Sequence, residues 1–253
     1  MLVFLTMFMI GILLGFIGAG GSGIMIAVLT TIFGVSVHTA LGTSLSAMVF
    51  SSLTGAYSHI RESNVVLRIG ISTGLFGALG ALIGSHTAQV VSGSGLKWLT
   101  ASALSMSTIL LWIRVFTKIG RSIANFKTQS SFSGAQFWFA SSSIGVITGT
   151  MSGLFGIGAA PFIQVCLLIF FGLSVQKAAG TTMFIIIPIA LMGGIGYYTI
   201  GYLDIWLFFK VVTGSMLGSY LGAKFTRRVN TMVLKVAMVT SPIAGAVLLL
   251  LGN

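Results

Sequence analysis

The sequence predicts an all-α, polytopic membrane protein built from two copies of one half. Its 253 residues are 56% hydrophobic and only 6% charged, and their mean hydropathy is +1.08. Apolar stretches near the length needed to span a bilayer, such as 65–87 and 98–113, exclude a soluble domain. The second observation is a repeat, because segment 15–44 recurs without a gap as segment 153–182.

The repeat has a constant offset, which is 153 − 15 = 138 residues. Pairs that recur unchanged near its start are Gly15 and Gly153, Gly18 and Gly156, and Gly20 and Gly158. The same offset still relates Gly80 to Gly218, far beyond the glycine-rich segment. Self-similarity over such a length indicates two diverged copies of one structural unit.

Each copy is expected to contain a glycine-broken helical hairpin followed by three long transmembrane helices. The helices expected in the first copy are 1–18, 22–33, 36–60, 65–87 and 96–116. Those expected in the second copy are 137–152, 160–171, 174–200, 203–226 and 232–251. We expect these bounds to hold to about three residues.

The domain organisation follows from these helices. We expect a first membrane repeat at 1–116 and a second at 135–253. The segment between them, 117–134, is basic, rich in serine and free of acidic residues. It is predicted to be a cytoplasmic linker.

The charge distribution predicts how the two halves are oriented. The chain has 13 Lys and Arg against 2 Asp and Glu, a net charge of +11. An odd number of apolar elements in each copy would invert the second half. With the linker inside, inversion places Arg61, Lys177 and Lys224 on the cytoplasmic side and leaves Lys97 and Lys210 nearer the outside. We therefore predict an inverted repeat with both termini extracytoplasmic.

The protein is predicted to be a multi-pass protein of the plasma membrane or cell inner membrane. Its basic residues sit in short loops and at span ends, where they meet anionic lipid. No DNA- or RNA-binding module is visible in the sequence, so nucleic acid is not an expected partner. The expected partners are the lipid bilayer and a small anionic substrate, and a homo-oligomer is compatible with the sequence.

The short helix of each hairpin predicts the location of a substrate site. Segment 22–33 has 12 residues, which cover roughly 18 Å as a helix and fall short of the roughly 30 Å hydrocarbon core. Broken backbone at membrane depth is tolerated where it is buried in protein or lines a cavity. Matching breaks in two halves of a transporter point to its binding site.

The chemistry expected at the breaks is anion binding by two helix N-termini, which begin near Ser22 and Ala160. Free N–H groups and the helix dipole both favour an anion there. The alternative is that the glycines only allow close helix packing. The shortness of these helices favours anion binding, because close helix packing alone does not require a short helix.

Hydroxyl and amide side chains near the breaks complete the candidate site. Hydroxyls at Thr43, Ser44, Thr181 and Thr182 could donate to an oxyanion, or could bond within or between helices instead. Gln164 is polar where the first copy has Ile26. The candidate substrate-binding residues are Gly20, Gly21, Ser22, Gly23, Thr43, Ser44, Gly158, Ala159, Ala160, Gln164, Thr181 and Thr182.

The residues that are missing restrict the function further. Glu62 and Asp204 are the only carboxylates, and both fall in predicted loops, so the sequence offers no intramembrane acid for a proton relay or a cation site. Cys166 is the only cysteine, which excludes a disulfide framework and a thiolate metal cluster. We find no catalytic motif, and therefore expect no enzyme activity, no metal and no cofactor.

The sequence resembles the TauE/SafE family of sulfite and organosulfonate exporters, which includes YfcA-like proteins. The segments that carry the resemblance are GFIGAGGSGIMIAVLT from Gly15, GLFGIGAAPFIQV from Gly153, YSHIRESNVVLR from Tyr57, GALGALIGS from Gly77 and SMLGSYLGA from Ser215. The resemblance covers nearly the whole chain except the linker. It departs at Ala159, Ala160 and Pro161, where the family more often has glycine, and at Val66, where an acid is common.

The resemblance implies a transporter of small sulfur-containing anions, which we expect to export sulfite or a short organosulfonate. The repeat and the charge pattern indicate a secondary transporter that works by alternating access between inverted halves. The alternatives are an anion channel with the two hairpins as a fixed filter, or a non-transporting membrane subunit.

Overall fold

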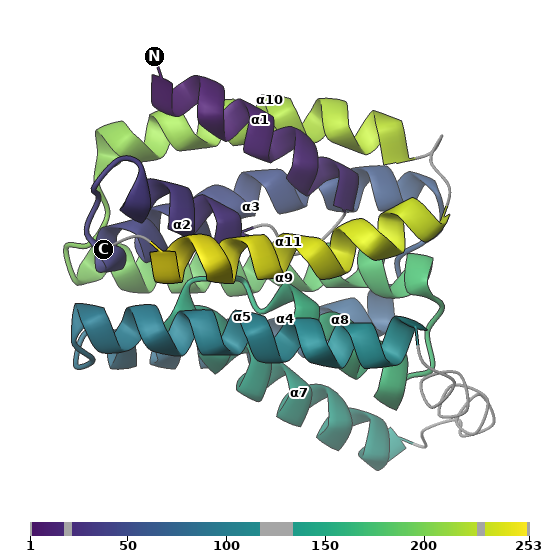
Figure 1. Ribbon diagram of the computed structural model, residues 1–253. Coiled ribbons are helices and arrows are strands. Elements are labelled where there is room, and N and C mark those ends of the chain that lie inside the picture. The colour runs from purple at the N-terminus through teal and green to yellow at the C-terminus, as the bar shows by residue number, and fades with distance from the viewer. Residues whose placement is uncertain (1, 18–21, 117–133, 227–230, 252–253) are drawn as a thin grey trace.

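The computed structural model describes residues 2–17, 22–116, 134–226 and 231–251, and all regular elements in these ranges are α-helices (Figure 1). The first half contains α1 (Leu2–Ile17), α2 (Ser22–Thr31), α3 (Val37–Arg61), α4 (Leu67–Ala88) and α5 (Gly93–Phe116). The second contains α7 (Gly134–Phe155), α8 (Ala160–Phe170), α9 (Val175–Thr199), α10 (Ile205–Thr226) and α11 (Thr231–Leu251). Every bound lies within about three residues of its expected place, so the predicted helices are confirmed.

Equivalent serines begin the long central helix of each half. Ser36 caps α3 by accepting a hydrogen bond from the backbone N–H of Thr39 at 3.2 Å. Ser174 caps α9 in the same way through the N–H of Lys177 at 3.4 Å. A serine at this position satisfies one of the free N–H groups of the first turn. The local start signal is therefore conserved between the two copies.

The outer helix pairs repeat the same contacts in both halves. A side chain on Gly11 of α1 would meet Ser215 of α10, and one on Gly15 would meet Ser219. At the same offset, a side chain on Gly149 of α7 would meet Gly77 of α4, and one on Gly153 would meet Ala81. The chain runs in the same direction along both members of each pair, and glycine is required because backbones touch there. Each half therefore packs its first helix on the fourth helix of the other half.

The two equivalent central helices, α3 and α9, run antiparallel through the middle of the molecule. A Cβ on Gly42, near the start of α3, would lie 2.9 Å from the Tyr197 side chain near the end of α9. A Cβ on Gly55, later in α3, would lie 3.2 Å from Met183 near the start of α9. This reversal is the relation that an inverted repeat requires. The orientation of each end relative to the cytoplasm stays a prediction.

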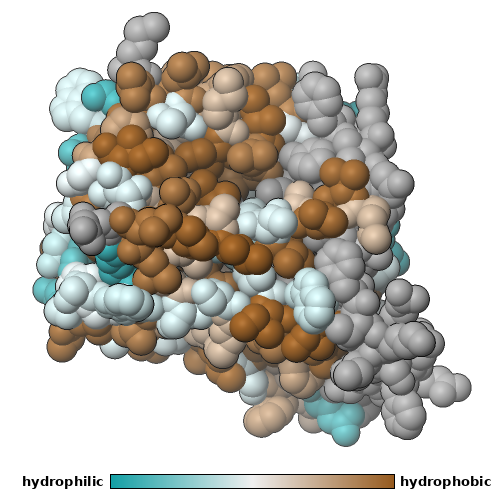
Figure 2. Space-filling model, viewed as in Figure 1, coloured by the Kyte–Doolittle hydropathy of each residue, from teal (hydrophilic) through white to brown (hydrophobic). Residues whose placement is uncertain are grey.

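The outer surface of the bundle is apolar, as a helical membrane protein requires. Large hydrophobic side chains are exposed along most helices, for example Leu79, Phe139 and Trp206. Figure 2 shows hydrophobic residues over most of one face, with the strongly hydrophilic ones near its left and lower right ends. Among the described residues, three helical segments are long and apolar enough to cross a membrane, namely Leu67–Ala88, Gln176–Thr199 and Ile205–Gly222. The division into two repeats and a linker stays a prediction, since residues 117–133 lie outside the described residues.

Candidate functional site

The second hairpin turns between α7 and α8 through backbone that only a few residue types adopt easily. Gly156 and Gly158 have φ angles of +63° and +64°, and Ala159 has a φ of +43°. The left-handed region suits glycine but is uncommon for residues with a Cβ. Strain of this kind at an alanine, held by surrounding packing, is typical of functional sites.

The N-terminus of α8 is buried and carries no side-chain cap. Ala159 and Ala160 are both completely buried, and no side chain in the described ranges accepts a hydrogen bond at the N-cap. Ile163 donates its N–H to the Ala159 carbonyl at 2.9 Å, so the regular hydrogen bonds of the α8 backbone begin with the N–H of Ile163. Pro161 lies in the first turn and has no N–H to satisfy. The remaining N–H groups of this turn form an electropositive end that suits an anion.

Gln164 adds an amide donor one turn further along α8. Its side chain is only 3% exposed, and its Nε2 atom is buried without a hydrogen-bond partner among the described residues. Long side chains on a helix lean back over the turn that precedes them. This tendency favours a position of the Gln164 amide near the uncapped start of α8. A buried amide donor without a partner is costly unless a ligand satisfies it.

The turn between α7 and α8, residues 156–159, is the second break, and it packs on α3 of the other half. Ser44 donates to the Gly156 carbonyl at 3.4 Å as well as to the Leu41 carbonyl at 3.1 Å. A side chain on Gly156 would run into Leu41, and one on Gly158 would run into Met48. The end of α7 is fixed from α9, since the Tyr197 hydroxyl donates to the Gly153 carbonyl at 2.9 Å. The break therefore lies where the two halves meet.

The four predicted hydroxyl residues separate into two groups. Ser44 has the backbone bonds given above, and Thr181 accepts a hydrogen bond from the Val66 N–H at 3.0 Å. Thr43 and Thr182 are completely buried, and their Oγ1 atoms have no partner among the described residues. The bonds of Ser44 and Thr181 are the helix-packing bonds expected as the alternative, whereas a role of Thr43 and Thr182 in ligand binding stays a prediction.

The first break is described only in part. Gly20 and Gly21, predicted for the site, lie outside the described residues, as does the side chain of Ser22. Ser22 begins α2, as expected, and Gly23 is buried with the Leu104 side chain 2.8 Å from the place of a Cβ. The convergence of the two helix N-termini on one anion therefore stays a prediction.

Comparison with known proteins identifies the family. The profile of the family described as "Sulfite exporter TauE/SafE" matches residues 3–249. The chain belongs to the TauE/SafE family. The resemblance stated from the glycine-rich segments is thereby confirmed.

Several relatives of this TauE/SafE protein carry transporter names. A Bacillus subtilis protein named "Probable membrane transporter protein YdhB" is 46% identical over 250 residues, which are 99% of this chain and 100% of the relative. A second Bacillus subtilis protein, YunE, has the same description and is 24% identical, with 93% of each chain covered. One from Methanocaldococcus jannaschii, MJ0441, is 26% identical over 94% of this chain and 90% of the relative. No solved structure matches the chain. Family and names together assign a membrane transporter.

Sequence reasoning missed the neighbours that shape the site in this TauE/SafE protein. Leu41 and Met48 hold the second break from α3, and Tyr197 holds the end of α7 from α9. Leu41 and Met48 look like ordinary apolar residues of a span, so nothing in the sequence distinguished them. Tyr197 gave a weak signal, because a tyrosine inside a span needs a partner for its hydroxyl.

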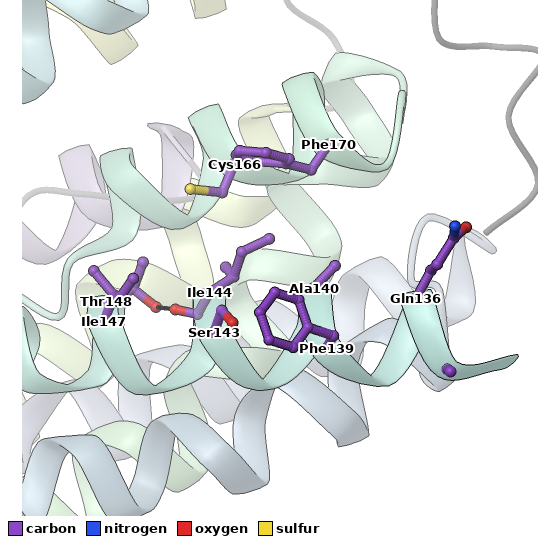
Figure 3. Close-up of a pocket in the computed structure, with 10 residues that line it drawn as sticks. Gln136, Phe139, Ala140, Ser143, Ile144, Ile147, Thr148, Cys166 and Phe170 are labelled. Atoms are coloured by element: carbon purple, nitrogen blue, oxygen red, sulfur yellow. Dashed lines mark hydrogen bonds between the residues drawn. The ribbon is translucent and has the colours of Figure 1, made fainter. Parts of the chain in front are cut away.

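A large groove lies elsewhere, between α7 and α8, and contains none of the predicted site residues. Its volume is about 740 Å³, and Phe139, Ile144, Ile147 and Phe170 are among the residues that line it (Figure 3). Exposed hydrophobic side chains surround it, which places it on the lipid-facing surface. This groove is therefore distinct from the candidate anion site.

Proposed function

We propose that this protein is a secondary transporter that exports small sulfur-containing anions, such as sulfite or a short organosulfonate. The observation that carries the proposal is the uncapped, fully buried N-terminus of α8 with the unpartnered Gln164 amide behind it. Such a site offers N–H donors and no carboxylate, so it favours an oxyanion. The family description supports the substrate class.

The way the two halves are joined supports alternating access as the mechanism. The second break rests on α3 of the first half, and α3 and α9 run antiparallel between the two hairpins. A movement of one half against the other would therefore change the contacts of the break directly. Ser44 and Met48 are the residues across which we expect this movement.

The proposed membrane orientation places the linker in the cytoplasm. Figure 1 shows the start of α1 and the end of α11 at one end of the bundle, and the end of α5 and the start of α7 at the other. In a background with Cys166→Ala, single cysteines beside Arg61 and beside Lys224 should both react with a membrane-impermeant thiol reagent from the cytoplasm. Labelling from opposite sides would disprove the inverted arrangement.

A thermal-shift screen tests the substrate. Purified protein is titrated with sulfite, sulfate, thiosulfate, taurine, sulfoacetate and simple carboxylates, because a ligand of the folded state raises the apparent melting temperature. We expect the largest shift with sulfite or an organosulfonate. Gln164→Leu should remove most of that shift, and the matched variant Ile26→Leu in α2 should keep it. An equal shift in both variants would remove Gln164 from the site.

Flux measurements distinguish a carrier from a channel. In proteoliposomes, a transporter exchanges labelled sulfite for unlabelled sulfite and saturates at low flux. Large unitary currents would instead support an anion channel with a fixed filter. If a ligand shifts the melting temperature but no flux of any kind follows, the protein is a binding subunit and the transport proposal is wrong.

A further inference from the structure

The groove between α7 and α8 has the shape of a site for one hydrocarbon chain. Figure 3 shows side chains of α7 on one side and Cys166 and Phe170 of α8 on the other. Its α7 residues recur at helical spacing along a single face. The residues that line it are Ala135, Gln136, Phe139, Ala140, Ser143, Ile144, Ile147, Thr148, Cys166 and Phe170.

The groove is long enough to hold an acyl chain across one leaflet of a bilayer. From Ala135 to Thr148 it follows α7 for roughly 20 Å at the rise of an α-helix. One leaflet contributes about half of the roughly 30 Å hydrocarbon core. Ala135 lies at the very start of α7, next to the water-facing end of the bundle, whereas Thr148 lies well inside the helix. An acyl chain that enters at Ala135 would reach the middle of the bilayer before the groove ends at Thr148.

The interior of the groove suits hydrocarbon better than water. The Thr148 hydroxyl is already used, since it donates to the Ile144 carbonyl at 2.6 Å within α7. Phe139 and Ile147 are 76% and 60% exposed, so both present large apolar surfaces to whatever fills the groove. Contact with a saturated chain would bury this apolar surface, and the exposed Gln136 at the start of α7 can stay hydrated.

Two basic residues lie near the end of the groove at Ala135 and Gln136, which we call its mouth. The Arg68 guanidinium lies 4.4 Å from the centre of the ring of Phe137, a buried residue that follows the groove residue Gln136 in the chain. Lys177 is exposed in the first turn of α9, which follows Phe170 after a short loop. Two cations at the membrane surface attract an anionic headgroup.

We propose that this groove binds one acyl chain of an anionic phospholipid, with its headgroup phosphate held by Arg68 and Lys177. The lipid would cover the outer face of α8, the half-helix whose N-terminus forms the candidate anion site. The proposal does not depend on the transported substrate, because it rests on the groove and the charge at its mouth.

Native mass spectrometry of the delipidated full-length protein tests the proposal with two lipids of equal chain length. We expect one phosphatidylglycerol to be retained in preference to phosphatidylcholine. Ser143→Trp fills the groove and should abolish this retention. The matched control is Leu5→Trp, the repeat-equivalent position, which is exposed on α1 and should leave retention unchanged. Arg68→Gln and Lys177→Gln should each weaken the preference by roughly fivefold.

Cys166 provides a second readout that needs no variant. It is the only cysteine in the sequence and it lines the groove, so any thiol labelling reports on this site. Saturating phosphatidylglycerol should slow the reaction of Cys166 with a lipid-soluble maleimide, and phosphatidylcholine should do so less. If Ser143→Trp does not fold, this measurement on the unchanged chain still decides the question.

Three outcomes would overturn the proposal. Equal retention of both lipids would show that Arg68 and Lys177 do not select an anionic headgroup. Unchanged Cys166 labelling in saturating phosphatidylglycerol would show that no chain occupies the groove. A dimer that Ser143→Trp converts to a monomer, without any effect on lipid, would show that a second copy of the protein covers this face instead.

Discussion

Equivalent corners at the two ends of the bundle share their backbone contacts but differ in their polar bonds. At one corner the loop between α3 and α4 packs on α9, where a Cβ on Gly180 would lie 2.5 Å from the Asn64 carbonyl oxygen. At the other, the loop between α9 and α10 packs on α3, where a Cβ on Gly42 would lie 2.7 Å from the Tyr202 carbonyl oxygen. These pairs are related by the repeat, so the close approach is common to both halves.

The polar bonds at these corners have diverged. Thr181 accepts a hydrogen bond from the Val66 N–H, whereas its equivalent Thr43 has no partner among the described residues. Asp204, the equivalent of Val66, instead caps α10 by accepting from the Leu207 N–H at 3.0 Å. The repeat thus gives both corners the same backbone packing, whereas the sequence differences give them different hydrogen bonds.

The second corner has an aromatic contact in addition. His38 stacks on Tyr202 with ring centres 4.7 Å apart, and its Nε2 lies 3.2 Å from the Val91 carbonyl oxygen. Its neighbour in the repeat, Lys177, is exposed at the opposite end. His38 is therefore packed in the structure, whereas Lys177 is free to meet solvent or lipid headgroups.

The largest effect should come from the contacts that both halves share. Gly149→Val would push a side chain into the backbone of α4, and Gly11→Val would do the same against α10. Overpacking against backbone cannot be relieved by a rotamer change, so we expect each variant to lose about 3 kcal/mol or more. Fluorescence-detected size-exclusion chromatography should show little folded protein.

The control for these variants is Gly134→Val, because no atom of the described residues lies within 4 Å of the place of its Cβ. It should fold normally. If Gly149→Val folds well while Gly11→Val does not, the two outer helix pairs are not energetically equivalent. That result would contradict the prediction that both halves depend on the same backbone contacts.

Transport should be abolished by Gly158→Val, with part of the protein still folded. A Cβ there would meet the flexible Met48 side chain, and the positive φ adds strain of about 1–2 kcal/mol. Gly201→Val is the matched control, since Gly201 has a φ of +84° and open space around it. It carries the strain without touching the break, so its flux in proteoliposomes should persist. Normal flux in Gly158→Val would exclude the second break as the site.

The unequal threonines should respond in opposite ways to the same substitution. Thr181→Val leaves the Val66 N–H without an acceptor, which should lower the unfolding free energy by about 1–3 kcal/mol. Thr43→Val removes a hydroxyl that has no partner in the described part of the protein, so stability should stay the same or rise. Melting temperatures without ligand measure this difference.

Ligand binding should show the reverse order. Thr43→Val should reduce the thermal shift produced by the substrate, and Thr181→Val should largely keep it. Equal losses of apparent stability and equal ligand shifts in both variants would mean that the two hydroxyls have the same role.

The smallest effects should come from the helix caps. Asp204→Ala removes the cap of α10 and should cost about 1 kcal/mol. Val66→Asp installs the equivalent cap on α4, which has no side-chain cap, and should gain up to about 1 kcal/mol. Opposite shifts in melting temperature are expected, while a loss of stability in Val66→Asp would show that the loop at Thr181 excludes the carboxylate.

The sequence by itself determined the helical architecture and the family. Hydrophobic composition, the repeat and the short glycine-broken segments are local or periodic properties, so the helix bounds and the break at Gly158 could be predicted directly. The constant offset also predicted which residues are equivalent, and the packing of Gly11 and Gly149 obeys it. The capping serines Ser36 and Ser174 are short-range signals of the same kind.

Only the tertiary structure decided which polar groups have partners. Thr43 and Thr181 are the same residue at equivalent positions, yet one is bonded to a loop and the other is not. Ser44 reaches the Gly156 carbonyl across a sequence separation that no periodicity encodes. Hydrogen bonds between distant segments depend on tenths of an ångström in helix packing, because their energy falls steeply with distance and angle. The sequence supplies the donors and acceptors, and the packing of the two halves determines which of them remain for a ligand.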